Sequence, residues 1–250
     1  MIRNSFIFLP RIGARTEQKL WNSGITNWNT FLENKKVPCF SQFRKLQANR
    51  LLEKARINLA EYNSQHFHKL LPNSETWRLY DHFKDDACFL DIETTGYYGD
   101  ITVIGLYNGY DTKTMVKGKN LNIHALKQEL QKYKLILTFN GSSFDLPVIN
   151  KYYPNTIPNI PHIDLRHACA RLGLTGGLKK VEKTLNICRA KEVSDIGGEQ
   201  AVYLWQMYKS TGKQNYLDLL IQYNEEDIIN LKPLADYAYK NLKEKFYKIK

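Results

Sequence analysis

Two carboxylates two residues apart, Asp91 and Glu93, are the strongest candidates for chemistry in this chain. They lie in the apolar, β-prone run Phe89–Gly96. In a strand, side chains i and i+2 point to the same face, so both would project together. Two negative charges so near each other repel unless a cation lies between them. Hard carboxylate oxygens suit Mg²⁺ or Mn²⁺. A strand with a solvated polar face is the alternative, because Asp-x-Glu is a common pattern.

A third acid, Asp145, follows a polar turn. The apolar run 135–137 leads into Asn140-Gly141 and Ser142-Ser143, and a helix is expected to begin at Phe144. An Asp in a first helical turn is also favoured by the helix dipole alone. The turn offers hydrogen-bonding groups and a tight backbone for close approach to a ligand. The candidate ligand contacts here are Asn140, Ser143 and Phe144.

A fourth acid, Asp227, lies in the segment YNEED within the helical run Tyr216–Leu231. Tyr223 and Asp227 are four residues apart and therefore share a helix face. Apolar residues surround them, and a carboxylate on a half-buried face needs a partner. Glu225 and Glu226 are expected to point elsewhere, into solvent.

Three further residues, Asp164, Lys179 and Lys180, have two readings each. Asp164 could be a fifth acid near the site, but a cap on the helix Leu165–Leu172 is favoured. His167 is expected to lie on that helix. Lys179 and Lys180 follow a Gly-Gly pair at a helix start, where they could hold phosphate or simply be solvated.

The residue pattern also predicts the elements that would position these side chains. Strands are expected at Ala87–Thr94, Ile101–Tyr107, Thr112–Lys117, Lys134–Phe139 and His162–Ile163. Asn108-Gly109 predicts a hairpin between the second and third strands. Helices are expected at Leu121–Tyr133 and Phe144–Tyr153, followed by helix and loop after Leu165. This order matches an RNase H-like α/β fold, with three antiparallel and then parallel strands in one mixed sheet flanked by helices.

The segment before this sheet is expected to be a small all-α domain. Short helices are predicted at Ala14–Trp21 and, capped by Thr26, through Leu32. A long basic amphipathic helix is predicted from Ser41 to Leu70, with a possible break near Asn63-Ser64 and an apolar stripe of Leu46, Leu51, Leu52, Ala55 and Leu59. Ser74 could cap a short helix that ends at Phe83. The domains are placed at 1–75 and 85–245.

The turn Pro10-Arg11-Ile12-Gly13 resembles the hairpin of helix-hairpin-helix elements. In that family a Pro-Gly-Ile-Gly hairpin offers backbone N–H groups to phosphates without reading base sequence. Arg11 replaces the first glycine here, and its guanidinium could preserve phosphate affinity. Arg11 and Gly13 are therefore candidate nucleic-acid contacts, with a small packing domain as the alternative.

Charge is unevenly distributed along the chain. The net charge is +11, of which residues 1–84 contribute +8 from 14 Lys/Arg and 6 Asp/Glu. A basic segment of this kind suggests a polyanion, most often nucleic acid, although solubility alone is the alternative. No apolar run approaches the ~20 residues of a membrane span, and the N-terminus does not read as a signal peptide. Four scattered cysteines suggest buried thiols in a reducing cytoplasm rather than zinc ligands or disulfides.

Together, Asp91, Glu93, Asp145 and Asp227, with Tyr223, resemble the motif set of DEDD-type 3′–5′ exonucleases of the tyrosine subgroup. The resemblance covers about residues 86–235. Its segments FLDIETTG, TFNGSSFDLP, HIDL, GGLKKVEKTLNI and YNEEDIINL look like those of YprB-type RNase H-like exonuclease-domain proteins of prokaryotes. Some archaeal members have a similar hairpin-helix region at the N-terminus.

This resemblance implies a mechanism with two Mg²⁺ or Mn²⁺ ions about 4 Å apart. It assigns Asp91 as the ligand shared by both ions, Glu93 and Asp227 to one of them, and Asp145 to the second through water. Tyr223 would orient the attacking water, because a phenol with a pKa of ~10 is a poor base at neutral pH.

Three functions are compatible with these features. The first is an exonuclease that shortens single-stranded DNA or RNA from the 3′ end. The second is a non-catalytic or structure-specific nucleic-acid-binding module on the same fold. The third is a protein-interaction scaffold, for which no partner can be named.

Overall fold

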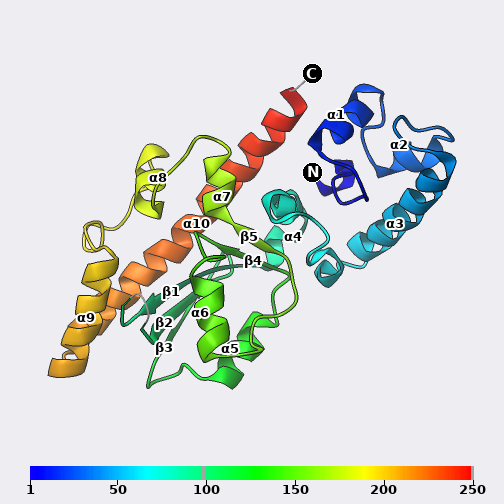
Figure 1. Ribbon diagram of the computed structural model, residues 1–250. Coiled ribbons are helices and arrows are strands. Elements are labelled where there is room, and N and C mark those ends of the chain that lie inside the picture. The colour runs from blue at the N-terminus through cyan, green and yellow to red at the C-terminus, as the bar shows by residue number, and fades with distance from the viewer. Residues whose placement is uncertain (97–98, 249–250) are drawn as a thin grey trace.

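The computed structural model describes residues 1–96 and 99–248, and its centre is a five-stranded sheet of order β3-β2-β1-β4-β5 (Figure 1). The strands are β1 Ala87–Thr94, β2 Ile101–Tyr107, β3 Thr112–Val116, β4 Leu135–Thr138 and β5 His162–Asp164. β1, β2 and β3 are antiparallel neighbours, whereas β4 is parallel to β1 and β5 is parallel to β4. The predicted mixed α/β sheet is confirmed, with strand ends that differ by no more than one residue.

β1 lies at the centre of the sheet because its residues are apolar toward both faces. Leu90 and Ile92 pack toward α5 (Ile123–Leu130) and α6 (Asp145–Tyr152). Phe89 packs on the opposite face, in the same cluster as residues of the long helix α10 (Gln214–Lys248). Side chains alternate along a strand, so Asp91 and Glu93 share the face of Phe89. The acidic pair of β1 therefore looks toward α10.

The remaining helices of this region are α7 Leu165–Ala170, α8 Leu178–Thr184 and α9 Gly198–Thr211. Helix α5 is shorter than predicted, because the Asn122 side chain accepts a hydrogen bond from the Ala125 N–H and so fixes the start of the helix. Helices α9 and α10 pack side by side along the sheet (Figure 1). Figure 1 also shows the C-terminal end of α10 beside the N-terminal helices.

The N-terminal region is helical, as predicted, but two helix limits were wrong. It contains α1 Ala14–Asn22, α2 Trp28–Glu33, α3 Gln42–Ala60 and α4 Tyr80–Phe83, with 3₁₀ turns between them. Asn27 rather than Thr26 caps α2, because its side chain accepts from the Thr30 N–H. Helix α3 ends at Ala60 rather than at Leu70, since Tyr62 takes a left-handed φ of 56° that stops the helix.

Two other expectations for this region were wrong. Leu46, assigned to the buried stripe of α3, is 54% exposed, because the buried face runs through Ala48, Leu52, Ala55 and Leu59 on the other side of the helix. Residues 73–83 form a 3₁₀ turn, Asn73–Leu79, followed by α4, and the Ser74 side chain does not cap them.

A buried ion network fixes the N-terminal region in place. The fully buried Arg78 donates to Glu17 at 2.8 Å and to Glu75 at 2.7 Å. Trp77 and Trp21 contact Phe246 near the end of α10. One hydrophobic cluster includes residues of both the N-terminal region and the sheet. The division into domains at residues 75–85 stays a prediction.

The four cysteines are free thiols. Cys88 and Cys169 are buried as expected, but Cys39 and Cys188 are exposed, because both lie in loops outside the core. No helix in the described residues is long and apolar enough to cross a membrane.

Candidate active site at the carboxylate cluster

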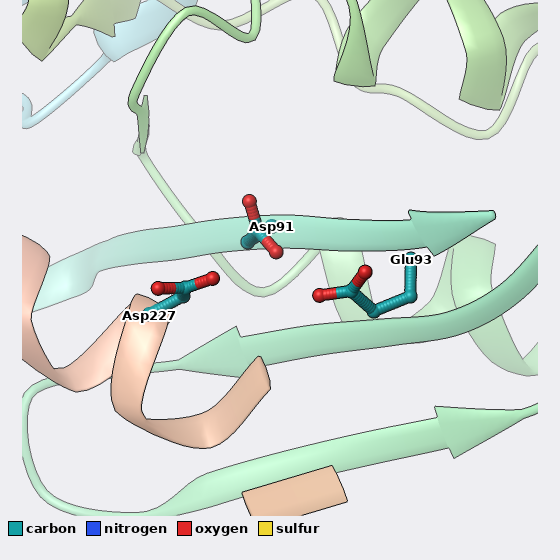
Figure 2. Close-up of side chains that lie close together, drawn as sticks. All are labelled: Asp91, Glu93 and Asp227. Atoms are coloured by element: carbon teal, nitrogen blue, oxygen red, sulfur yellow. The ribbon is translucent and has the colours of Figure 1, made fainter. Parts of the chain in front are cut away.

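Three of the predicted acids meet between β1 and α10. Asp227 reaches from α10 toward β1, where Asp91 and Glu93 lie (Figure 2). One carboxylate oxygen from each of the three lies within 4.8 Å of the other two. Asp227 and Glu93 are only 7% and 8% exposed. Three buried or half-buried carboxylates at this separation form a set of hard oxygen donors suited to a divalent cation.

Tyr223 lies beside this cluster, one helical turn before Asp227. It is 8% exposed and lines the same cavity as the three acids. Burial raises the pKa of the Asp227 carboxyl, and Arg189 together with a hydrogen bond from the Tyr223 hydroxyl offsets part of that rise. The predicted face shared by Tyr223 and Asp227 is therefore present in α10.

Asp145 approaches β1 from the start of α6. Its carboxylate accepts a hydrogen bond from the Ile92 backbone N–H at 3.1 Å, between Asp91 and Glu93 in sequence. The side chain is 3% exposed. Asp145 lies outside the set of three whose oxygens are within 4.8 Å, but its charge still raises the pKa of Asp91 and Glu93. It is thus the outlying member of a group of four acids.

Burial dominates the electrostatics of these acids. It raises the pKa of Asp91 well above the usual range, and the charges of Asp145 and Asp227 add to the effect. Burial and Asp227 do the same to the pKa of Glu93. Burial raises the pKa of Asp145 to about 7. Ionising all four acids is therefore unfavourable without added positive charge, and a bound cation would supply that charge.

Arg189, a residue not singled out from the sequence, is the cation that contacts this group of acids in the described residues. Its Nη2 donates to Asp227, and its side chain is 6% exposed. Glu182 of α8 binds the same guanidinium through two bonds of 2.7 and 2.8 Å. Asn230 of α10 donates to Glu182 at 3.0 Å. Arg189 thus links α8 to the carboxylate cluster.

Asn224 and Gly105 form a second contact that was not predicted from the sequence. The Asn224 amide donates to Asp91 at 2.9 Å. Gly105 on β2 is paired with Asp91 and leaves the space that Asn224 occupies, since a Cβ at Gly105 would lie 2.0 Å from Asn224 Oδ1. A glycine inside a strand often marks such a close approach, and this signal was available in the sequence.

A cavity of about 670 Å³ opens at the acids. Ile92, Phe144 and Val202 give it apolar walls, and Gly198 and Glu199 at the start of α9 close another side. Phe144, a predicted nucleic-acid contact, therefore lines the cavity. Such a mixed lining suits a ligand with both an apolar ring and charged groups.

The polar turn before α6 is organised by Asp164. This carboxylate accepts from the N–H groups of Asn140 at 2.8 Å and Ser142 at 3.1 Å, and it caps α7 through the Arg166 N–H. The capping role of Asp164 is confirmed. Asn140 has a left-handed φ of 70° and accepts from the Arg166 side chain, whereas Ser143 is exposed. His167 lies on α7, as predicted.

The predicted phosphate contacts lie in three different settings. Lys179 bonds to the backbone carbonyls of Ser194 and Ile196, and its Nζ lies 5.4 Å from the Tyr223 ring centre, so it is near the site but engaged. Lys180 is exposed. Arg11 and Gly13 are also exposed and lie in the N-terminal region, away from the acids.

The turn from Pro10 to Gly13 has one feature in common with a glycine-containing hairpin. Arg11 has a left-handed φ of 62°, the conformation that a glycine would take without strain. Gly13 is the residue before α1. The element before Pro10 is a single 3₁₀ turn, Ile2–Asn4, rather than an α-helix.

No curated protein sequence matches the chain significantly. Among solved structures, the chain is similar to the family B DNA polymerase from the hyperthermophilic archaeon Pyrobaculum calidifontis, with 12% sequence identity and a TM-score of 0.49. That match covers 60% of this chain and 24% of the polymerase chain. Residues 88–239, more than half of the sequence, match the model of an RNase H superfamily family, and the chain therefore belongs to the RNase H superfamily.

Proposed function

We propose that this protein is a metal-dependent 3′–5′ exonuclease that hydrolyses single-stranded DNA or RNA. The observation that supports this proposal most is the meeting of Asp91, Glu93 and Asp227 within 4.8 Å, at the wall of a cavity that Tyr223 also lines. Membership in a superfamily of nuclease-type hydrolases supports the same reaction class. The motif order of the four acids and Tyr223 supports the DEDD-type assignment with tyrosine.

The residues fit two divalent ions of the Mg²⁺ or Mn²⁺ type. Among the described residues, Arg189 is the one cationic side chain that contacts the four buried or half-buried acids. The cluster therefore keeps a negative charge that added cations would balance. Asp91, Glu93 and Asp227 would hold one ion, with Asp91 shared, and Asp145 would act on the second through water. When bound, such ions lower the pKa of water and stabilise negative charge on the phosphate.

The side chains of the protein supply orientation. Tyr223 would orient the attacking water through its hydroxyl, which stays protonated because burial and the nearby Asp227 raise the pKa of the phenol. Phe144 would lie against the terminal base or sugar in the cavity. Asn140, Ser143, Lys179 and Lys180 are proposed as contacts to the strand, as are Arg11 and Gly13 in the N-terminal region. The cytoplasm is the proposed compartment.

The alternative is a nucleic-acid-binding module without catalysis. The basic N-terminal region, with a net charge of +8, is what favours it. The two functions differ in one result, because a binding module would show salt-sensitive binding without cleavage under any metal.

The test is digestion of single-stranded DNA, single-stranded RNA and duplexes, each labelled once at the 5′ end and once at the 3′ end, with Mg²⁺, Mn²⁺ or EDTA. The proposal predicts ladders from 5′-labelled strands and immediate release of mononucleotide from 3′-labelled strands. Asp227→Ala should be inactive. Asp218→Ala, an exposed acid on the same helix, should digest at the wild-type rate. Release of labelled fragments longer than one nucleotide from the 3′-labelled strands would instead indicate an endonuclease.

A further inference from the structure

Helix α3 has a second, outward face that its packing does not use. Phe43, Leu46, Arg50, Lys54 and Ile57 follow one another at intervals of three or four residues and so form one stripe, here called the outer stripe. Phe43 is 69% exposed, Leu46 54% and Ile57 53%. The buried residues of α3 lie on the opposite side of the helix. The apolar groups of the outer stripe therefore face solvent and lie outside the packed side of α3.

The outer stripe combines cationic and apolar groups, and the side chains of Asn49 and Asn58 flank it. One hollow of about 580 Å³ is lined by Arg50, Lys54 and Asn58, and a neighbouring hollow of about 440 Å³ by Phe43 and Leu46. The two hollows share Asn49 and so adjoin each other on α3, and together they are called the groove below.

The charge of this groove is unbalanced. Its single acid, Glu53, is paired with Arg56 at 2.7 Å. Neither Arg50 nor Lys54 forms an ion pair within the described part of the chain. The two cations are four residues apart, about 6 Å along the helix axis. Two adjacent and unpaired cations in a segment of net charge +8 are complementary to a polyanion.

We propose that the outer stripe of α3 binds single-stranded nucleic acid, with Arg50 and Lys54 on phosphates and a base stacked on Phe43. The inference rests on the proposed function, which requires the chain to engage such a strand. Proteins bind single strands without reading sequence by stacking bases on exposed aromatic rings, beside cations that contact the phosphate backbone. The exposed Phe43 ring beside these cations favours a nucleic-acid strand over an acidic protein, because a base can stack on it. Figure 1 places α3 far from β1, so the stripe would hold a part of the strand remote from the scissile bond.

The test measures binding of a 5′-fluorescein-labelled 30-nucleotide oligo(dT) by fluorescence anisotropy in EDTA, over a range of salt concentrations. The protein used is the full chain with the substitution Asp91→Asn, which prevents cleavage of the oligonucleotide. Phe43→Ala and Arg50→Ala/Lys54→Ala are added to this background. Lys209→Ala/Lys213→Ala, which replaces one exposed lysine in the last turn of α9 and one just after the helix, is the control that removes the same charge. Circular dichroism checks that each variant is folded.

Arg50→Ala/Lys54→Ala should weaken binding and reduce the slope of log K against log salt by about 1.4, since each phosphate contact in a single strand contributes about 0.7. Phe43→Ala should weaken binding at least about fivefold with an unchanged slope. The control should change neither quantity appreciably. The inference is overturned if both stripe variants bind like the control, or if polyglutamate displaces the oligonucleotide while Phe43→Ala has no effect, which would assign the stripe to an acidic protein. Because no cleavage is measured, failure of the proposed nuclease activity would be seen separately, in the digestion assay.

Discussion

Arg189 donates a hydrogen bond to Asp227, although 38 residues separate them in sequence. The guanidinium is itself held by Glu182 through two bonds, so a buried chain of alternating charge runs from α8 to the acids. This arrangement orients the Asp227 carboxylate and partly offsets the charge of the cluster. Asp227 is therefore positioned by residues that do not line the cavity themselves.

The first prediction concerns this buried pair. Arg189→Met should lower the free energy of unfolding by about 3–5 kcal/mol, because it leaves the Glu182 charge buried without its partner. Urea denaturation in EDTA measures the change. Arg189→Met/Glu182→Leu should recover part of the loss, since both charges are then removed. Equal stability of Arg189→Met and wild type would show that the pair does not support the site.

The second prediction concerns the space between β2 and α10. Gly105→Ala should destabilise the fold by about 1–3 kcal/mol, because the new methyl group meets the Asn224 side chain. It should also slow cleavage by moving Asn224 away from Asp91.

A double-variant cycle isolates this contact. Gly105→Ala/Asn224→Ala should regain stability relative to Gly105→Ala but stay slow, because Asp91 still lacks its amide partner. Thermal melts and initial rates provide the two readouts. If the two substitutions add independently in stability, the steric account is wrong.

The third prediction concerns pH and metal. Folding raises the pKa of Asp145 to about 7 from an ordinary value near 4, and the pKa of Asp91 and Glu93 also lies well above the usual range. At a pH between the ordinary pKa of these carboxyls and their raised pKa in the folded protein, the folded protein binds more protons than the unfolded chain. The metal-free protein should therefore lose stability as pH rises from 6.5 to 8.5.

The measurement is the melting temperature in EDTA across this range, repeated with Mn²⁺. The range begins at 6.5 because burial lowers the pKa of His66, His82 and His162, which acts in the opposite direction at lower pH. Mn²⁺ should restore stability at pH 8.5, and Asp145→Asn should flatten the metal-free profile. A metal-free melting temperature that rises with pH equally in wild type and Asp145→Asn would contradict the assigned shifts.

The fourth prediction concerns Tyr223. Tyr223→Phe removes only the hydroxyl and should lower kcat by about 10², the usual cost of losing one hydrogen-bond donor aimed at the reacting atoms. KM and Mn²⁺ affinity should change little, because the phenol is not one of the three clustered acids. Since burial raises the pKa of Tyr223, the wild-type rate should show no alkaline decline from ionisation of the phenol below pH 10. Single-turnover kinetics would contradict this role if the variant retained the wild-type rate.

Local sequence patterns predicted the parts of the fold that depend on near neighbours. β1 and β2 were placed correctly because apolar β-prone runs end at turn residues, and Asp91 and Glu93 share a face because strand side chains alternate. Tyr223 and Asp227 share a face because they are four residues apart on a helix. The end of α3 was misplaced, since the left-handed Tyr62 gives no such pattern.

Tertiary packing determined the rest of the site. Arg189 lies in a loop, and nothing near it in sequence indicates that it meets Asp227. Asn224 is adjacent to Tyr223, but its role depends on the space left by Gly105 on another strand. Pairings of this kind are fixed by the crossing of α10 over β1 and β2, which no single segment encodes.

The central claim is that Asp91 and its neighbours hold metal ions that cleave a nucleic-acid strand. The most direct measurement is the initial rate of shortening of a 5′-labelled single strand by wild type and by Asp91→Asn, each in Mn²⁺ and in EDTA. The account predicts 3′–5′ shortening by wild type in Mn²⁺ alone, and a rate at least about 10³-fold lower for Asp91→Asn, whose side chain keeps the shape of the acid but loses its charge. Equal rates for the two proteins, or undiminished cleavage in EDTA, would contradict it.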